Sequence, residues 1–372
     1  MRSLLFTGLA AITFFIPSAF ALLQVQVVND SGLPDNEVFL LLTGQPLNTA
    51  LNKGPIKVAG IGVANSTGGV KNDPPVKGLA VSALQNTGEK LVSKFSGRTL
   101  PIYGFTMETL ASGVLYVSYR KPLEWVSAAP TARENIRFDK LELTFDAAIV
   151  SVANLTSIDF FGIPMQLERF VRNLDKLTLT QTHTFYTSTP TLLEKLAALG
   201  MSGAFVSTSG APWPMSKDFT NFARVVGPGQ YAASSPTGSP APYPSFDGYL
   251  QSLMKSNYTF KEKGFANDCH YDYTGRVEGD GAGGYLIRMK GTTTPPPPAP
   301  LPANSEIVLP LPNGRQPGAK QAQNLDHFIY GAVLNPDSIV LSGSGLTPDV
   351  SLATVPNSVY GWIAADVFSG LN

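Results

Sequence analysis

Several residue types that define common classes of protein are scarce in this chain. Its 372 residues include a single cysteine, Cys269, and three histidines, His183, His270 and His327. One cysteine cannot form an intramolecular disulfide, so stability must come from a packed core rather than from cross-links. The histidines stand far apart and show no metal-ligand spacing, so we expect no metal and no other cofactor.

Charge is also scarce and evenly balanced. Charged residues make up 15% of the chain, with 27 basic and 27 acidic side chains and a net charge of zero. No cluster of Lys and Arg stands out that could displace counterions from a phosphate backbone. We therefore expect no nucleic acid as partner, and a neutral ligand such as a glycan fits better.

Long hydrophobic runs are missing except at the N-terminus. Arg2 precedes an apolar run from Leu4 to Ile16, and Ala19-Phe20-Ala21 has the small-x-small form of a signal peptidase site. The run is shorter than the roughly 20 residues of a membrane-spanning helix. We therefore expect residues 1–21 to be a signal peptide, and the protein to be secreted and extracellular, with no membrane as partner.

Four Asn-x-Ser/Thr sequons are acceptors for glycans if the protein passes through a eukaryotic secretory pathway. They lie at Asn29, Asn65, Asn154 and Asn257.

Catalytic motifs of other enzyme classes are absent or misplaced. No Gly-x-Ser-x-Gly elbow of an esterase occurs. The run Gly279–Gly284 spells Gly-x-Gly-x-x-Gly, but no apolar strand precedes it and the β-like Tyr285-Leu286-Ile287 follows where a helix would begin. It predicts a turn between strands rather than a nucleotide site.

Composition and pattern predict a β-rich fold. The 35 glycines and 30 prolines indicate many turns, and hydrophobic residues at 43% are enough for a core. Leu23–Val28 and Glu37–Leu42 read as an opening hairpin. Further strands are predicted at 115–118, 138–145, 149–152, 157–161, 177–184, 306–311 and 328–333. Helices are predicted at 191–199 and 246–256, so the second half is mixed α/β.

The stretch Phe138–Asp146 carries the clearest pattern in the chain. Leu141, Leu143 and Phe145 alternate with polar residues, which predicts a strand with one face in a core and one polar face. Alternation alone favours an ordinary amphipathic strand. The next motif, Asn154–Pro164, places Asp159 in an apolar run, where a carboxylate is costly unless it is hydrogen-bonded or used. Two carboxylates on neighbouring strands, Glu142 and Asp159, could flank a glycosidic bond as acid and base.

These stretches, together with Gly113–Tyr119 and the opening residues 27–44, resemble glycoside hydrolase family 64, the laminaripentaose-producing β-1,3-glucanases. The resemblance is strongest over residues 23–165. It implies a thaumatin-like β-barrel or sandwich domain beside a mixed α/β domain, with a wide groove between them.

The resemblance implies domain bounds: the β-barrel at 22–165, the mixed domain at 166–340 and a C-terminal segment, 341–372, returning to the barrel. It implies an inverting endo-glucanase acting on laminarin-type glucan as a monomer. Glu142 is then the general acid and Asp159 the general base, while Thr144, Asp146 and Thr156 line the sugar groove. We expect Asn154 to carry no glycan there. Tyr116, Phe161 and Trp213 are candidates for stacking on sugar rings.

Two other functions remain open from the sequence. A thaumatin-like protein could hold β-1,3-glucan without cutting it, and the presence of both carboxylates argues against this alternative. The Pro- and Ser-rich stretches at 209–245 and 292–302 suggest a structural cell-wall or adhesive protein, although they read better as loops of a core-forming chain.

Overall fold

The structure is a computed structural model of all 372 residues. It describes residues 2–3, 11–12, 22–48, 53–130, 135–146, 151–155, 160–173, 176–184, 189–198, 201–208, 221–226, 251, 254–255, 259–266, 269–294, 306–311 and 339–342.

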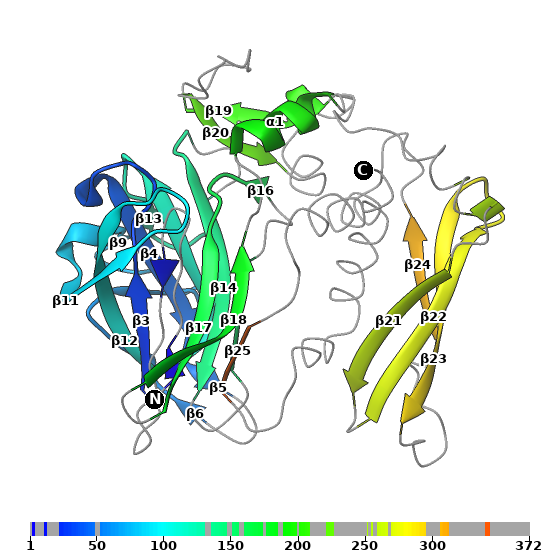
Figure 1. Ribbon diagram of the computed structural model, residues 1–372, viewed down its shortest axis with the longest axis horizontal. Coiled ribbons are helices and arrows are strands. Elements are labelled where there is room, and N and C mark those ends of the chain that lie inside the picture. Colours follow the sequence, from blue (N-terminus) through cyan, green and yellow to red (C-terminus); the bar gives the residue numbers. More distant parts are fainter. Residues whose placement is uncertain are drawn as a thin grey trace.

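The largest element is a sheet of ten strands whose principal path runs β10-β4-β12-β14-β15-β25, while β3, β7 and β11 also pair with β12 and β8 pairs with β4 (Figure 1). The strands are β3 (Leu23–Val27), β4 (Val38–Gln45), β7 (Lys57–Ala59), β8 (Val63–Asn65), β10 (Leu79–Ala80), β11 (Gln85–Val92), β12 (Thr99–Tyr119), β14 (Phe138–Asp146), β15 (Ser151–Leu155) and β25 (Ile339–Ser342). Short 3-10 turns, η1 (Asp35–Glu37) and η2 (Val81–Ala83), lie between them.

Strand β12 organises this sheet because it is 21 residues long and pairs with neighbours along its whole length. Its first half pairs with β3, and its second half pairs with β4, both antiparallel. The prediction of an opening hairpin is therefore wrong: β3 and β4 each bond to β12 and not to one another. The strand bends between its halves, where the pairing register shifts and Ser112 adopts a positive φ of 45°.

One face of the large sheet encloses the main hydrophobic core. Residues Val25, Leu42, Phe105, Leu115 and Phe145 are among its fully or nearly fully buried members. The smaller sheet of β17 (Gln166–Asn173) and β18 (Lys176–Thr184) contributes to this core through Leu167 and Phe170. The short strands β1 (Arg2–Ser3) and β2 (Ala11–Ile12) pair with β17.

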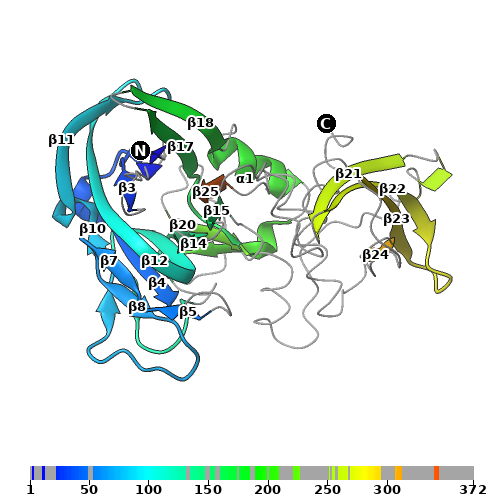
Figure 2. The ribbon, with the colours of Figure 1, turned by 90° about the horizontal axis from the view of Figure 1, so that it is seen from below.

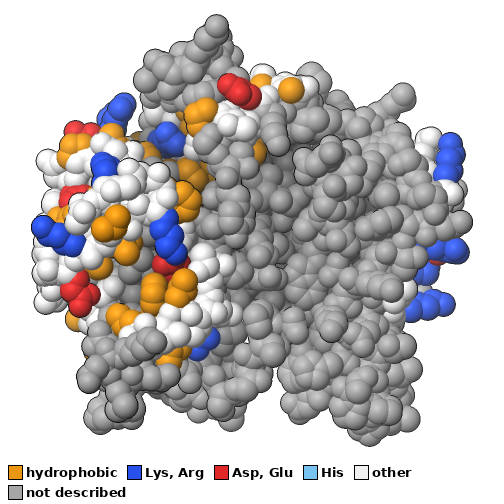
Figure 3. All heavy atoms as spheres, viewed as in Figure 1, with side chains coloured by type: hydrophobic (Ala, Val, Ile, Leu, Met, Phe, Trp, Pro, Cys, Tyr) orange, Lys and Arg blue, Asp and Glu red, His pale blue; other side chains and the backbone are white. Residues whose placement is uncertain are grey.

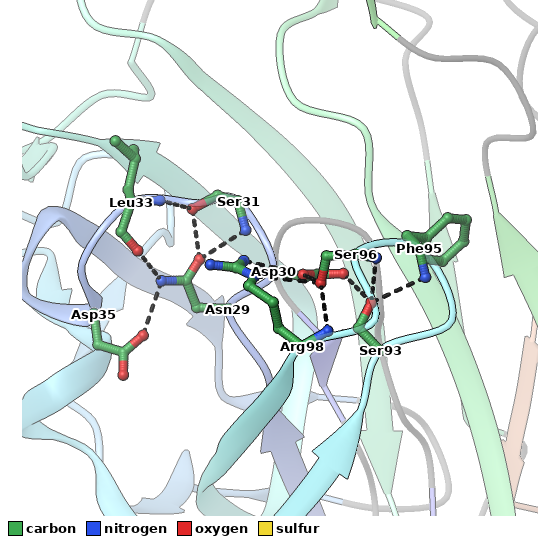
Figure 4. Close-up of polar contacts among 9 residues, drawn as sticks. All are labelled: Asn29, Asp30, Ser31, Leu33, Asp35, Ser93, Phe95, Ser96 and Arg98. Carbon is green, nitrogen blue, oxygen red and sulfur yellow. Dashed lines mark hydrogen bonds and ion pairs between the residues drawn. The ribbon is translucent and has the colours of Figure 1, made fainter.

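The turn after β3 is held by a polar network, drawn in Figure 4. The Asn29 amide donates to the carbonyl of Leu33 at 2.8 Å and to Asp35 at 2.8 Å, and its oxygen accepts the backbone N–H of Ser31 at 3.1 Å. The neighbouring Asp30 accepts hydrogen bonds from Ser93 and Ser96 and pairs with Arg98 at 3.1 Å. Asn29 is buried, so its amide is committed to the fold.

A sheet of three small strands packs against the start of β14, where Phe160 and Val226 share a hydrophobic cluster with Phe138. The strands are β16 (Phe160–Phe161), β19 (Phe205–Ser207) and β20 (Phe222–Val226), with α1 (Thr189–Ala198) and the 3-10 turn η3 (Met201–Ala204) beside them (Figure 1). Two pairs of short strands complete this part: β9 (Val76–Lys77) with β13 (Glu124–Trp125), and β5 (Leu47–Asn48) with β6 (Lys53–Gly54).

A separate antiparallel sheet runs β21-β22-β23-β24. Its strands are β21 (Thr259–Ala266), β22 (Cys269–Gly279), β23 (Tyr285–Thr294) and β24 (Glu306–Leu311), and they lie apart from the large sheet in Figures 1 and 2. The predicted turn at Gly279–Gly284 is confirmed: it joins β22 to β23, and Asp280 Oδ1 accepts the N–H groups of Ala282 and Gly284, each at 2.8 Å.

The fold is strand-rich, as the composition predicted. The predicted strands at 138–145, 177–184 and 306–311 coincide with β14, β18 and β24, and the predicted helix at 191–199 overlaps α1. Of the predicted helix at 246–256, residues 251, 254 and 255 are described and helical. The predicted strand at 328–333 lies outside the described residues.

Candidate active site

Glu142 lies on the outward face of β14, near the middle of the large sheet. Its backbone pairs with Val114 of β12 on one side and with Asn154 of β15 on the other. Its side chain is 48% exposed, and its carboxylate lies 3.7 Å from the ammonium of Lys140. The lysine side chain is 13% exposed, so the pair meets water mainly on the Glu142 side, and this carboxylate stays open to a ligand.

The alternation predicted for β14 is confirmed. Leu141, Leu143 and Phe145 are buried in the main core. Glu142 and Thr144 lie on the opposite face of the strand, where Glu142 is exposed and Thr144 is half-buried. Asp146 ends the strand, and its backbone pairs with Thr109 of β12.

The first residues of β14 hold the chain segment that directly follows Asp159. The carboxylate of Asp139 is fully buried and accepts the backbone N–H groups of Gly162 at 2.8 Å and Ile163 at 3.0 Å, as well as that of Lys140 at 2.8 Å. A Cβ atom on Gly162 would lie 2.2 Å from the carbonyl oxygen of Phe138, so only glycine permits this approach.

Two arginines, Arg137, which is half-buried, and Arg224, which is fully buried, complete this junction. Arg137 donates from Nε to the carbonyl of Gly162 at 2.9 Å. Arg224 of β20 is fully buried, donates to the carbonyl of Ile136, and places its guanidinium 4.1 Å from the ring centre of Phe138. The ring of Phe138 in turn meets that of Phe160 edge-on at 5.0 Å. Residues 160–163 are thus attached to the start of β14 by hydrogen bonds, cation–π contacts and ring contacts.

The buried charges of this junction have shifted pKa values. Burial raises the pKa of Asp139 to about 7, although its three N–H donors and the charge of Lys140 oppose the shift. Burial also lowers the pKa of Arg137. A second buried acid, Glu168 of β17, has its pKa raised to about 7 by burial, and Lys94 and Gln166 oppose that shift.

The sequence-predicted site residues differ in what the structure says of them. Glu142 and Thr144 share the outward face of β14. Asp159 and Thr156 lie outside the described residues, as does Trp213. The expectation that Tyr116 and Phe161 border the groove is wrong: they are 5% and 1% exposed. Tyr116 packs instead against Trp125 and Phe138, so its ring serves a hydrophobic cluster.

Asp139 is the residue of this region that sequence reasoning missed. It lies in phase with Leu141, Leu143 and Phe145, on the face of the strand that the pattern assigns to the core. A carboxylate on an apolar face is costly without hydrogen bonds. The position of Asp139 on the core face could therefore have predicted that it is buried and hydrogen-bonded.

The described residues contain no group of three or more His, Cys, Asp or Glu placed to hold a metal ion. In the same parts of the chain, no helix is both long and apolar enough to cross a membrane.

Comparison with known proteins identifies the family. The model of glycoside hydrolase family 64, described as β-1,3-glucanase, matches residues 21–298. This match covers most of the 372 residues, so the chain belongs to glycoside hydrolase family 64. It is therefore a glycoside hydrolase of the β-1,3-glucanase type, as the resemblance implied.

Two solved structures are similar to the chain, both of the family 64 laminaripentaose-producing β-1,3-glucanase from Paenibacillus barengoltzii. The complex with laminarihexaose matches 68% of this chain and 74% of its own at 14% identity, with a TM-score of 0.32. The second structure matches 63% of this chain and 72% of its own at 14% identity, with a TM-score of 0.29. No curated protein matches the chain. The family assignment rests on the family model alone.

Proposed function

We propose that the protein is a secreted, inverting endo-β-1,3-glucanase that hydrolyses laminarin-type glucan, with Glu142 as general acid and Asp159 as general base. Membership of the family supports β-1,3-glucan as the substrate. Thr144, Asp146 and Thr156 are proposed to contact the sugar chain.

The observation that carries these roles is the attachment of the segment after Asp159 to the strand of Glu142. Leu155, before residues 156–159, pairs with Leu141 of β14. Phe160, after them, contacts Phe138 of the same strand. The connection that carries Asp159 thus begins and ends against the strand that carries Glu142, which supports a paired site on this face.

The chemistry requires two carboxyl groups in different protonation states. The protonated Glu142 would donate its proton to the glycosidic oxygen as the bond breaks. Asp159 would take a proton from a water that attacks the anomeric carbon from the opposite side, so the configuration inverts. We expect the two carboxyl groups to lie roughly 6.5–9.5 Å apart, which leaves room for that water.

We also propose the domain organisation that the family resemblance implies. The large sheet would be the thaumatin-like barrel of residues 22–165, the mixed domain would span 166–340, and a wide groove would lie between them. The pairing of β25 with β15 supports a return of the C-terminal part to the barrel. Residues 1–21 would be removed on export, which would also remove β1 and β2 from the edge of β17.

The test is Glu142→Gln, which keeps the shape of the side chain and removes the transferable proton. Hydrolysis of laminarin should fall by about two orders of magnitude or more, the scale of general acid catalysis, while the folded state persists. Glu124→Gln is the matched control, because Glu124 is also an exposed strand carboxylate with a lysine partner, Lys77, at 3.8 Å. It should retain full activity. Fresh product from the wild type should show the α-anomer by NMR. Wild-type activity of Glu142→Gln, or a product of retained configuration, would contradict the assignment.

A further inference from the structure

The outer surface of the large sheet holds a polar cavity at a distance from Glu142. Its volume is about 360 Å³, and it lies among β3, β7, β11 and β12. Its polar lining comes from Gln24, Gln26, Gln85, Thr87, Glu89 and Thr106. We propose that this cavity is a second binding site, which takes a neutral carbohydrate and does no chemistry on it.

The floor of the cavity is a glycine between two glutamines. In the strand register, Gly104 of β12 pairs with Gln26 of β3 on one side and with Gln85 of β11 on the other. A Cβ atom on Gly104 would lie 2.8 Å from the carbonyl oxygen of Val25, which explains the glycine. The two glutamine backbones lie two strand spacings apart, roughly 10 Å, and Gly104 places no side chain between them.

A second row of residues extends the cavity along the strands. Thr106 of β12 pairs with Gln24 of β3 and with Ala59 of β7. On the β7 side, the lining residues Ala59 and Gly60 have a methyl group and no side chain, so they fill little of the cavity. Hydrogen-bonding groups therefore converge on the cavity from strands on both sides of β12.

Gln26 is the most deeply set polar side chain of the lining. The residue is 3% exposed, and it lines the cavity. Its amide is not among the buried polar groups without a partner, so within the described residues it meets the solvent of the cavity. A sugar hydroxyl in the cavity would take the place of water at this amide.

The groups of the lining select the chemistry of that ligand. Each glutamine amide both donates and accepts, and so does each threonine hydroxyl, which matches the hydroxyl groups of a sugar. Among the described residues, no lysine or arginine lines the cavity, which disfavours an anion, and Glu89 is the one carboxylate of this lining. Phe105 reaches the lining but is only 3% exposed, so no ring is available to anchor an apolar molecule.

The cavity is distinct from the candidate active site. Thr106 of the cavity and Val114, the partner of Glu142, are eight residues apart on β12 and lie on either side of its bend at Ser112. In Figure 2, β3, β7 and β11 lie at the end of the molecule away from β21–β24, whereas β14 and β15 lie between. The described charges on the visible face of the large sheet are scattered in Figure 3, without a patch of one sign. A glucan chain could thus be held here while another part of it is cut.

Titration of the full chain with a β-1,3-linked glucose trisaccharide, followed by NMR of the side-chain amide groups, tests the inference. The NH₂ resonances of Gln24, Gln26 and Gln85 should shift saturably. The double variant Gln24→Ala/Gln85→Ala should bind the trisaccharide about tenfold more weakly or worse, since two hydrogen-bonding groups are lost. Its retention on insoluble β-1,3-glucan should fall accordingly. Gln26→Met, which keeps the volume of the side chain, should also weaken binding.

The control is Asn36→Ala, which removes an exposed amide from η1, outside the cavity, and should change neither readout. Unshifted glutamine amides, or undiminished retention of the double variant, would overturn the inference. So would an equal response of these amides to Ca²⁺ or to a primary amine, which would mark a cation site at Glu89. The result is independent of the proposed catalytic roles: binding here without hydrolysis would defeat those roles alone, and hydrolysis without these shifts would defeat the cavity alone.

Discussion

The buried carboxylate of Asp139 offers a sharp test of how this protein holds its candidate site. In Asp139→Asn the side chain keeps its size but has one acceptor oxygen instead of two. The wild-type Oδ2 accepts from Gly162 and Ile163, and Oδ1 accepts from Lys140. Whichever way the amide turns, at least one backbone N–H loses its acceptor and faces the NH₂ group.

The expected loss follows from the cost of buried donors without partners. Each costs about 1–3 kcal/mol, and the substitution leaves one or two of them. We therefore expect the free energy of unfolding to fall by about 2–4 kcal/mol at pH 4, where the difference in charge between the two proteins is smallest, and this is a large share of the stability of a typical domain.

The pH dependence of this difference has a definite sign. The folded pKa of Asp139, about 7, lies above its ordinary value of 3.8, so between these pH values the folded state binds a proton that the unfolded state has released. Wild-type stability should therefore decline as pH rises from about 4 to 7, by at most about 4 kcal/mol at 1.4 kcal/mol per pH unit. Asp139→Asn cannot titrate, so the gap between variant and wild type should narrow with rising pH. Glu168 titrates in the same window, but its effect is common to both proteins and cancels.

Urea unfolding followed by tryptophan fluorescence at pH 4, 6 and 8 measures both effects. The midpoint should move to lower urea without a change in slope. Asp280→Asn is the matched control, because Asp280 also accepts two backbone N–H groups but is exposed, where water replaces the lost bonds. It should cost less than about 1 kcal/mol. Equal midpoints for Asp139→Asn and wild type at pH 4, or a gap that widens with rising pH, would refute the reasoning.

Three further predictions concern the roles of single side chains. Asp159→Asn should lose laminarin hydrolysis by about two orders of magnitude or more, and added azide should restore part of the turnover if it occupies the place of the attacking water. When the protein is expressed in a eukaryotic secretory host, Asn29 should carry no glycan, because its amide is buried and hydrogen-bonded. Asn65 is only half-buried and can carry a glycan. Peptide mass spectrometry shows which of the two sites is modified. Arg224→Lys should lower the free energy of unfolding by about 2 kcal/mol, because a lysine cannot stack its charge over Phe138 as a guanidinium does, and unchanged urea midpoints would exclude this contact as a source of stability.

Patterns that depend on neighbouring residues were readable from the sequence. Strand β14 follows from the alternation of Leu141, Leu143 and Phe145, because a strand half buried in a core must alternate. The turn at Gly279–Gly284 follows in the same way, since Gly281 and Gly283 adopt positive φ values of 78° and 89° that other residues avoid. Glu142 came from the resemblance to the family and not from the alternation.

Features set by distant contacts were not readable. The first half of β12 contains Pro101 and Gly104, and Gly113 follows in its second half, so the sequence suggests breaks where the strand is continuous. These glycines serve close packing instead: a Cβ atom on Gly113 would lie 2.7 Å from the carbonyl of Leu143. Since β12 is long enough to pair with both β3 and β4, it prevented the local hairpin that the turn residues favoured.

The placement of buried charge argues that the junction around Asp139 serves positioning. Asp139 and Arg224 are fully buried, and Arg137 joins them at the same junction between β14 and the chain after Asp159. Burying such groups costs desolvation, and apolar residues of similar volume often stabilise a fold as well or better. Unlike apolar contacts, hydrogen bonds are directional. Each of these bonds therefore fixes the position of a particular backbone atom of residues 136 or 162–163. A site that needs two carboxyl groups at a set separation gains from this arrangement, which holds residues 160–163 against the strand of Glu142.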